Sequence, residues 1–265
     1  MEYKIVKLNT ARNSLRYIVK AFNIKEIYIP YYICPVVRSA LNKENCKINF
    51  YNVDLQFKPK QQFPKDAFIL YPNYFGVCSD IVEELSLKYK NLIVDNAHSF
   101  FSEPKGIATF NSLRKFFNQL RDGSFLYIKK SFYLNLEEDN YSYNNDLMTE
   151  EEFVLNENRL DKQDIKFISQ NTDALFEKID IELEKQRIKN HFDFYHKKYG
   201  SENLLNLIIS EDDYPFKYPL LVNSVERANE IVSELSIQGV TVYRYWNNLP
   251  KSFDEKVFYE RLICI

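Results

Sequence analysis

The first part of the sequence alternates between short apolar segments and amphipathic, helix-like segments. Strands are expected near Ile48 to Val53 and at Ala67 to Tyr71, and an apolar run at Leu92 to Val94 follows the helix-like segment Asp80 to Lys90. Strands that alternate with helices in this way form a mainly parallel sheet with helices packed on its faces. The alternation therefore predicts an α/β fold in which successive strand ends lie at one edge of the sheet.

Polar residues follow two of the expected strands. Asp95 comes directly after the apolar run Leu92 to Val94. A further expected strand, Ile107 to Phe110, leads into Ser112 and Lys115. Because open α/β sheets bind ligands at the carboxyl ends of their strands, we expect the acid, the hydroxyl and the amine in one site.

An acid and a lysine from adjacent strand ends suit pyridoxal phosphate in particular. This cofactor needs a lysine for its covalent attachment and a carboxylate that keeps its pyridine nitrogen protonated. Ser112, close to Lys115, supplies a hydroxyl for the phosphate group. Lys129 and Lys130 are rival lysines, but they follow an Asp-Gly turn and lack a preceding hydroxyl. The less specific alternative is a structural carboxylate at Asp95 and a surface lysine at Lys115.

The amino-terminal segment predicts an anion site. Thr10 or Asn9 caps a helix whose apolar residues recur at helical spacing from Leu15 to Phe22. The amide groups at the start of such a helix attract anions, and Arg12 adds a guanidinium suited to phosphate. The alternative for Arg12 is an exposed residue on a capped amphipathic helix.

These segments together resemble the DegT/DnrJ/EryC1/StrS family of sugar aminotransferases, which are fold-type I pyridoxal-phosphate enzymes. The family's D-x-A-[QH]-S block resembles Asp95 to Ser99, and its S-[FL]-x-K block, followed by D-G-G, resembles Ser112 to Lys115 with Asp122-Gly123-Ser124. Its phosphate-binding turn resembles Thr10 to Leu15, and its P-x-Y-x-[CFW] segment resembles Pro30 to Cys34.

The resemblance implies a fold and a set of site residues. The fold is an aspartate aminotransferase-like large domain, with a mainly parallel, seven-stranded-type sheet sandwiched by helices, and a small α+β C-terminal domain. We expect the cofactor-binding domain, with an irregular connector at its end, to span residues 1–172, and the long helix and small domain to span 173–265. The implied catalytic residues are Lys115 and Asp95. The implied cofactor-binding residues are Ala11, Arg12, Asn13, Tyr32, Cys34, Asp95, His98, Ser112 and Lys115, and no metal site is expected.

The activity implied by the resemblance is that of a pyridoxal-phosphate-dependent aminotransferase. The amino group would pass from an amino acid, with glutamate as the expected donor, to a nucleotide-linked keto sugar in surface-glycan or related sugar biosynthesis. The implied assembly is a homodimer. Two alternatives stay open: a noncatalytic or assembly paralogue of the family, and a pyridoxal-phosphate sugar dehydratase. Lys115 favours the aminotransferase, because some dehydratase relatives carry histidine in place of that lysine.

Charge, hydropathy and cysteine usage argue against several other classes. The formal net charge is -2, from 35 basic and 37 acidic residues, so the chain has no global attraction for nucleic acid or anionic membrane. No apolar run approaches the roughly 18 to 20 residues of a membrane helix, and the amino terminus lacks the apolar core of a signal peptide.

Four cysteines without a C-x-x-C pair predict reduced thiols and a cytoplasmic protein. His191 and His196 lack a third ligand nearby and are expected to be solvated helix residues.

The pattern changes beyond Lys130. Leu136 to Asn158 is rich in Glu, Asp and Asn and has little apolar periodicity, which favours a partly ordered connector. Phe176 to Tyr199 is expected to form one long helix. The remaining expected elements are a strand at Phe216 to Val222, a helix at Val225 to Ile237, a strand at Val240 to Tyr243 and a helix from about Phe253, and Tyr245 to Pro250 resembles a small-domain block of the family.

Overall fold

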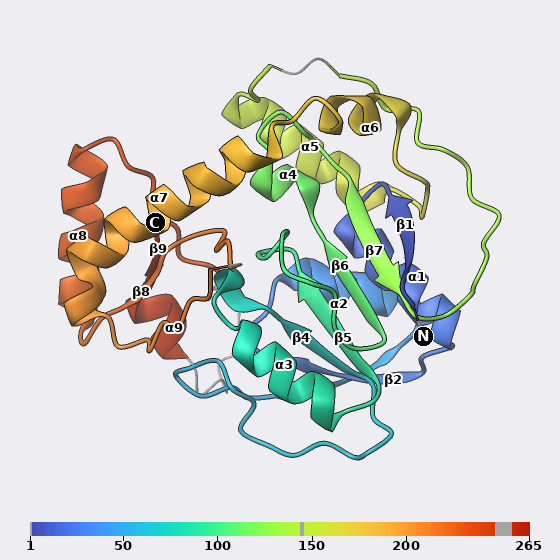
Figure 1. Cartoon of the computed structure of the whole chain (residues 1–265), viewed down its shortest axis with the longest axis horizontal. Coiled ribbons are helices and arrows are strands. Elements are labelled where there is room, and N and C mark those ends of the chain that lie inside the picture. Colours follow the sequence, from blue (N-terminus) through green and yellow to red (C-terminus); the bar gives the residue numbers. More distant parts are fainter. Residues whose placement is uncertain (1, 144–145, 212, 247–255) are drawn as a thin grey trace.

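The computed structural model describes residues 2–143, 146–211, 213–246 and 256–265 of the chain. Its centre is a seven-stranded sheet with the strand order β1-β7-β6-β5-β4-β2-β3 (Figure 1). β7 runs antiparallel to both of its neighbours, and the other pairs in the sheet are parallel. The strands are β1 (Lys4–Leu8), β2 (Glu26–Pro30), β3 (Lys47–Tyr51), β4 (Ile69–Pro72), β5 (Leu92–Asn96), β6 (Ala108–Asn111) and β7 (Ser124–Ile128).

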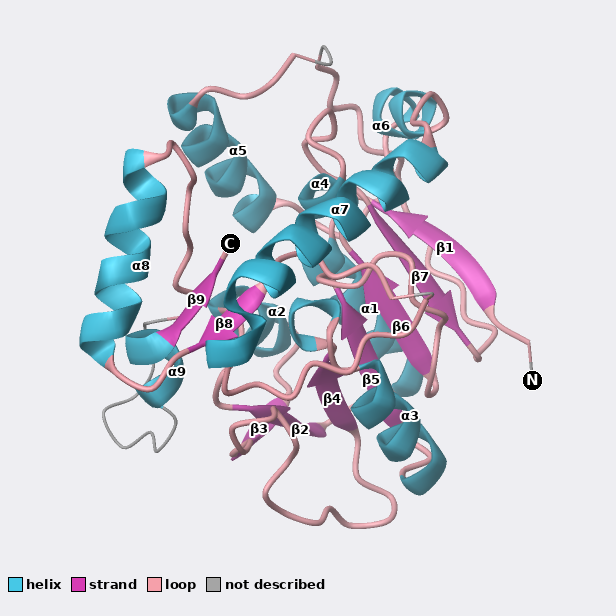
Figure 2. Ribbon diagram, turned by 60° about the vertical axis from the view of Figure 1, so that its left-hand side comes forward, coloured by secondary structure: helices cyan, strands magenta, loops and turns pink. Residues whose placement is uncertain are grey.

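Helices cover both faces of this sheet (Figure 2). α1 (Ala11–Phe22) and α2 (Pro35–Lys43) pack on one face, and α3 (Ser79–Lys88) packs on the other. The other helices among the described residues are α4 (Leu113–Phe116), α5 (Glu150–Lys162), α6 (Gln170–Phe176), α7 (Ile181–Tyr199), α8 (Val225–Ile237) and α9 (Lys256–Arg261), with short 3₁₀ turns η1 (Tyr74–Gly76) and η2 (Gly200–Glu202). The predicted α/β architecture, with a mainly parallel sheet between helices, is confirmed.

Side-chain alternation along the strands determines which face carries the polar residues. Leu92 and Val94 pack in the apolar cluster that includes α3, whereas Ile93 packs in the cluster that includes α1 and α2. Because successive side chains of a strand point to opposite faces, Asp95 follows Ile93 onto the side of α1 and α2. Phe110 of β6 packs in that same cluster.

The C-terminal part of the chain packs against the large domain through aromatic residues, with Phe258 lying 4.8 Å from Tyr32 between ring centroids. It contains a two-stranded antiparallel sheet of β8 (Pro219–Leu221) and β9 (Leu262–Cys264), flanked by α8 and α9. One apolar cluster runs from the α3 face of the large sheet through Phe192 and Tyr195 of α7 into these strands. Phe192 and Tyr195 of α7 pack on Tyr218 beside β8, within a cluster that also contains residues of the large sheet.

Two predictions, one for a connector and one for a helix, were wrong. The connector expected at Leu136 to Asn158 contains the start of α5, which begins with a capping box in which Thr149 and Glu152 exchange hydrogen bonds of 2.8 and 3.2 Å. The single helix expected from Phe176 instead begins at Ile181. Asp180 caps it by accepting a hydrogen bond from the Leu183 amide at 3.0 Å, and this cap separates α7 from α6.

Strand predictions in the C-terminal part were too long. The strand expected at Phe216 to Val222 is reduced to β8. The strand expected at Val240 to Tyr243 does not form. In this segment Tyr243 makes an isolated antiparallel bridge to Cys264. α8 begins and ends as predicted, whereas Phe253 and the segment Asn247 to Pro250 lie outside the described residues.

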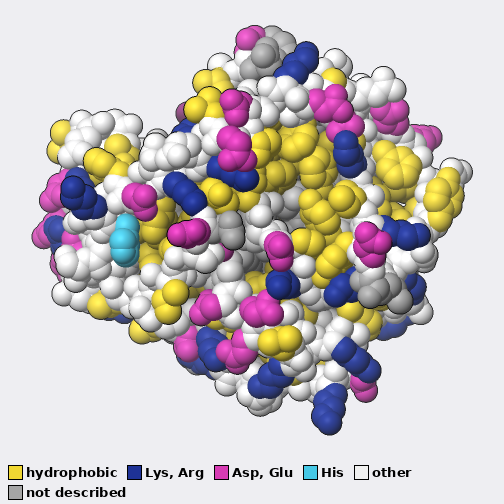
Figure 3. Space-filling view, in the orientation of Figure 1, with side chains coloured by type: hydrophobic (Ala, Val, Ile, Leu, Met, Phe, Trp, Pro, Cys, Tyr) yellow, Lys and Arg dark blue, Asp and Glu magenta, His cyan; other side chains and the backbone are white. Residues whose placement is uncertain are grey.

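The surface carries both signs of charge. Lys and Arg side chains alternate with Asp and Glu over the face seen in Figure 3, without a broad basic area on that face. Within the part of the chain that the structure describes, no helix is long and apolar enough to cross a membrane, and no cluster of three or more His, Cys, Asp or Glu side chains is arranged to hold a metal ion.

Candidate active site

One cavity lies where the first turn of α1, the start of α2 and the carboxyl ends of β5 and β6 meet. Asp95 reaches it from the end of β5, and Lys115 reaches it from α4. The predicted site residues that line this cavity are Ala11, Arg12, Cys34, Asp95, Ser112 and Lys115. The structure thus brings together residues that are separated by up to about a hundred positions in the chain, because the strand ends share one edge of the sheet.

Asp95 is buried in this cavity, with 9% of its surface exposed. Its Oδ1 accepts a hydrogen bond from the Ala97 amide at 2.9 Å, which orients the carboxyl group in the turn after β5. Burial raises the pKa of Asp95, while Lys115 and the Ala97 hydrogen bond oppose that rise. A positively charged ligand group beside Asp95 would therefore favour its ionised form.

Lys115 faces the same cavity from α4. Burial lowers the pKa of Lys115; Cys34 and Asp95 oppose that change, and Arg114 adds to it. Among the described residues, no ion pair of 4.0 Å or less joins the Lys115 amine to Asp95. The two groups influence each other across a gap, which leaves space for a ligand in contact with both.

The turn at Asp122 and Gly123 holds α4 in place. The Leu113 amide donates a hydrogen bond to the Gly123 carbonyl at 3.1 Å, and Leu113 and Phe117 are fully buried. Gly123 has a φ of +95°, and a Cβ at this position would lie 2.5 Å from Leu113 Cδ1. A glycine is therefore required for the turn that fixes the backbone of Lys115.

The hydroxyl side chains of Thr10 and Ser112, both of which line the cavity, make different contacts. Thr10 caps α1 by accepting a hydrogen bond from the Asn13 amide at 3.1 Å. Ser112 occupies the N-cap position of α4 without a capping hydrogen bond from its side chain, and it lines the cavity. The Ser112 hydroxyl is therefore placed to bind a ligand rather than the helix.

Arg12 and Arg114 form a cationic end of the cavity that contacts α5. Arg12 Nη2 lies 3.4 Å from Glu157 Oε2, and Arg114 Nη1 lies 2.6 Å from Glu157 Oε1. Arg12 also pairs with Asp161 on the same helix. Burial lowers the pKa of Arg12, an effect that Glu157 opposes and Arg114 reinforces.

Sequence reasoning missed Arg114 and Glu157. Arg114 could have been found, because it precedes Lys115 within the same short turn. The signal for Glu157 was the capping-box pattern of Thr149 and Glu152, which predicts a helix where the acidic composition favoured a connector.

Three predicted cofactor residues do not line the cavity. The Asn13 side chain instead has a structural role, because its Nδ2 donates hydrogen bonds to Asn9 Oδ1 at 3.0 Å and to the Asp164 carbonyl at 2.7 Å. Tyr32 is fully buried among aromatic rings, with its ring centroid 5.8 Å from that of Tyr74.

His98 is the third of these residues. Its ring stacks on Phe216 at 5.0 Å and on Trp246 at 5.7 Å between centroids. Burial, with a smaller effect of Lys115, holds the pKa of His98 well below its ordinary value. His98 is therefore a neutral member of an aromatic stack at neutral pH.

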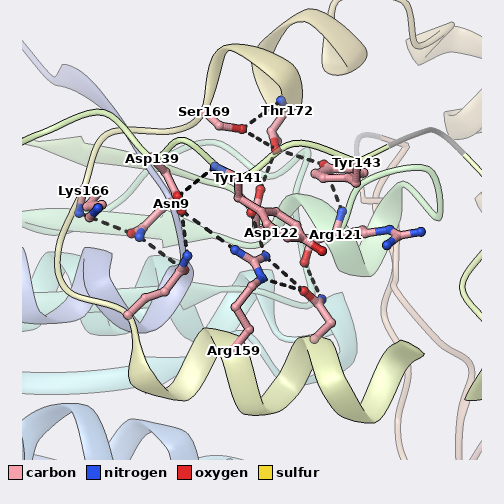
Figure 4. A network of polar contacts seen from close by, with 12 residues as sticks. Asn9, Arg121, Asp122, Asp139, Tyr141, Tyr143, Arg159, Lys166, Ser169 and Thr172 are labelled. Atoms are coloured by element: carbon pink, nitrogen blue, oxygen red, sulfur yellow. Dashed lines mark hydrogen bonds and ion pairs between the residues drawn. The ribbon is translucent and has the colours of Figure 1, made fainter. Parts of the chain in front are cut away.

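A polar network beside the cavity ties α5 and α6 to the turn that supports α4 (Figure 4). Asp122 accepts hydrogen bonds from Arg159 at 2.9 Å and from Thr172 at 2.6 Å. The Arg159 guanidinium also lies over the Tyr141 ring, 3.3 Å from its centroid. Asp122 is buried, so these bonds compensate for its lost hydration.

The chain as a whole has the fold of known sugar aminotransferases. The candidate sugar aminotransferase Spr1654 from Streptococcus pneumoniae, solved in apo, PLP and PMP forms, matches in its apo form with a TM-score of 0.66 and 17% identity, over 99% of this chain and 80% of that one. NtdA from Bacillus subtilis, solved with bound PMP, matches with a TM-score of 0.65 and 13% identity, over 100% of this chain and 68% of that one. A DegT DnrJ EryC1 StrS aminotransferase from Brucella abortus matches with a TM-score of 0.62 and 11% identity, over 100% of this chain and 80% of that one.

Neither a family sequence model nor a curated protein sequence matches the chain. The likeness is therefore one of fold, and it is the fold that the sequence blocks around Asp95 and Lys115 predicted. The residues present fit pyridoxal phosphate, since the cavity combines a buried acid, an amine across a gap and a hydroxyl that the helix does not use.

We predict that Lys115 reacts as a neutral amine at lower pH than an ordinary lysine. Its pKa lies below the ordinary 10.5, so a larger fraction is unprotonated at a given pH. Because Asp95 raises that pKa, the substitution Asp95→Asn should lower it further. Competitive acetylation of cofactor-free protein over a pH series, followed by peptide mapping, measures the midpoint. A midpoint at or above 10.5 for the wild-type amine would contradict the buried site.

Proposed function

We propose that the chain is a pyridoxal-phosphate-dependent aminotransferase that passes an amino group from an amino acid, with glutamate as the expected donor, to a nucleotide-linked keto sugar. The observation that carries this proposal is that the buried Asp95 and the half-buried Lys115 line one cavity at adjacent strand ends, without a close ion pair between them. The fold shared with sugar aminotransferases that bind PLP or PMP supports it.

The predicted site residues that line the cavity each have a part in this proposal. Lys115 would hold the cofactor covalently, Asp95 would pair with its ring nitrogen, and Ser112 and Arg12 would bind its phosphate, beside Ala11 and Cys34. Pyridoxal phosphate, when bound, supplies a cationic ring that stabilises negative charge at the substrate carbon. Burial favours the neutral form of the Lys115 amine, so Nζ is suited both to covalent attachment and to accepting and returning a proton at the substrate carbon.

The alternatives have less support. A noncatalytic paralogue would have no need for a half-buried amine beside a buried acid, because the lost hydration of these groups destabilises the fold. A sugar dehydratase of the kind that carries histidine at the lysine position is disfavoured by Lys115 itself. The chain has four free cysteines, which supports the proposal of a reducing, cytoplasmic location. The proposed role in surface-glycan or related sugar synthesis rests on the resemblance to sugar aminotransferases alone.

We predict that reduction with borohydride in the presence of pyridoxal phosphate labels Lys115. Its lowered pKa and its place in the cavity favour this amine over others, and L-glutamate should change the absorption spectrum of the unreduced complex. Lys115→Ala should lower turnover by on the order of a thousandfold. A label on Lys129 or Lys130 would contradict the site assignment, and no label at all would favour the noncatalytic paralogue.

We also propose a homodimer whose contact includes the outer side of α5. Phe153, Val154 and Leu155 are 45%, 54% and 61% exposed on this helix, an unusual apolar run for a surface. The same helix lines the cavity through Glu157 and Leu160, so a partner on its outer side would lie close to the site.

The expected result is a dimer in sedimentation at micromolar concentration and a shift toward monomer in Leu155→Glu. Leu87→Glu is the matched control, because Leu87 is 81% exposed on α3 and away from the cavity lining. A wild-type monomer with full turnover, or equal dissociation in both variants, would contradict this contact.

A further inference from the structure

Glu157 lies between the two guanidinium groups at the cationic end of the cavity. It contacts Arg114 at 2.6 Å and Arg12 at 3.4 Å, and both arginine side chains are largely buried, with 18% and 9% exposed. Arg12 and Ser112 are also the groups proposed above to bind the phosphate of the cofactor. A carboxylate of the protein therefore occupies a position beside the phosphate-binding groups.

This carboxylate is an imperfect partner for the two arginines. Glu157 Oε1 is buried and makes an ion pair with Arg114, yet it has no hydrogen-bond partner among the described residues. Its Oε2 reaches Arg12 at 3.4 Å, which is long for a charge-assisted hydrogen bond. A phosphate group has three acceptor oxygens and a charge of about -1.5 to -2, so it matches two guanidinium forks better than one carboxylate does.

The helix that carries Glu157 is held mainly by polar contacts. Only Asn156 and Leu160 of α5 are buried, and Asn156 Nδ2 donates to the Arg121 carbonyl at 2.8 Å. The pairs of Glu157 and Asp161 with the arginines hold α5 to α1 and α4. A helix with little buried apolar surface loosens locally at low free-energy cost when some of its polar contacts are replaced, even while the Arg159–Asp122 pair stays in place.

We propose that Glu157 competes with the phosphate of the cofactor for Arg12 and Arg114, so that Glu157 sets the affinity of the site and the cofactor loosens α5 as it binds. This inference rests on the proposed function and adds a residue that determines cofactor affinity. It makes Arg114, together with Arg12, part of the anion site. It also predicts that the effect of Glu157 depends on the phosphate group of the ligand.

The test compares Glu157→Gln with the wild type in equilibrium binding of pyridoxal phosphate and of unphosphorylated pyridoxal, followed by absorption. Glutamine keeps the size of the side chain and removes its charge, so pyridoxal phosphate should bind about tenfold more tightly, since a like charge beside the phosphate is lost. Pyridoxal binding should change by less than about twofold. Glu151→Gln is the matched control, because it removes one charge from an exposed position on the same helix outside the cavity lining.

A second measurement uses the wild-type protein alone. Inorganic phosphate, added against chloride at equal ionic strength, should increase hydrogen exchange of the α5 amides, because the ion replaces the contacts that hold the helix. Unchanged or slower exchange in α5 would overturn the proposed displacement.

The binding data separate the possible failures. Equal affinity of wild type and Glu157→Gln for pyridoxal phosphate, or a similar gain for pyridoxal, would overturn the competition while leaving the proposed function intact. Binding of neither ligand by either protein would contradict the proposed function itself, and with it the inference that rests on it.

Discussion

The site depends on a buried acid, Asp95, and a half-buried amine, Lys115, that line one cavity. Burial raises the pKa of Asp95 and lowers that of Lys115, and each group opposes the shift of the other. No ion pair within 4.0 Å joins Asp95 to Lys115, so neither group compensates fully for the lost hydration of the other. Such an arrangement destabilises the fold unless a ligand completes it, which is why we regard the pair as the chemical centre of the molecule.

The fold places this pair through simple geometry. The parity of side chains along β5 sends Asp95 to the same face as Ile93, and α4 is fixed by Leu113 and by the turn at Gly123. The polar network around Asp122 and Arg159 then joins α5 to that turn. The catalytic lysine of the proposal, its supporting turn and the helix that carries Glu157 are thus connected by direct contacts.

Much of this site could be predicted from the sequence because it depends on strand ends. Asp95, Ser112 and Lys115 follow apolar runs, and the runs determine both the sheet and the edge at which its ends meet. Tyr32 and His98 could not be placed in the same way, because residues in loops after strands turn toward whichever surroundings bury their rings, here an aromatic cluster.

Helix α5, the break between α6 and α7 and the contacts of Glu157 could not be predicted from the sequence, for identifiable physical reasons. α5 is acidic and buries only Asn156 and Leu160, so it lacks the apolar periodicity by which helices are found. The break between α6 and α7 depends on one capping side chain, Asp180, within a segment whose overall pattern is helical. Contacts between distant segments, such as that of Glu157 with Arg114, leave no trace in local pattern at all.

The central claim is that Asp95 acts on the chemistry of a cofactor held by Lys115. The most direct measurement is the single-turnover rate at which L-glutamate converts the bound cofactor in Asp95→Asn and in the wild type, each loaded with pyridoxal phosphate. We predict a fall of on the order of a hundredfold or more, with a urea unfolding midpoint close to that of the wild type, because asparagine is nearly isosteric with aspartate but cannot hold the proton on a ring nitrogen. A rate equal to that of the wild type, with the cofactor bound, would contradict the account.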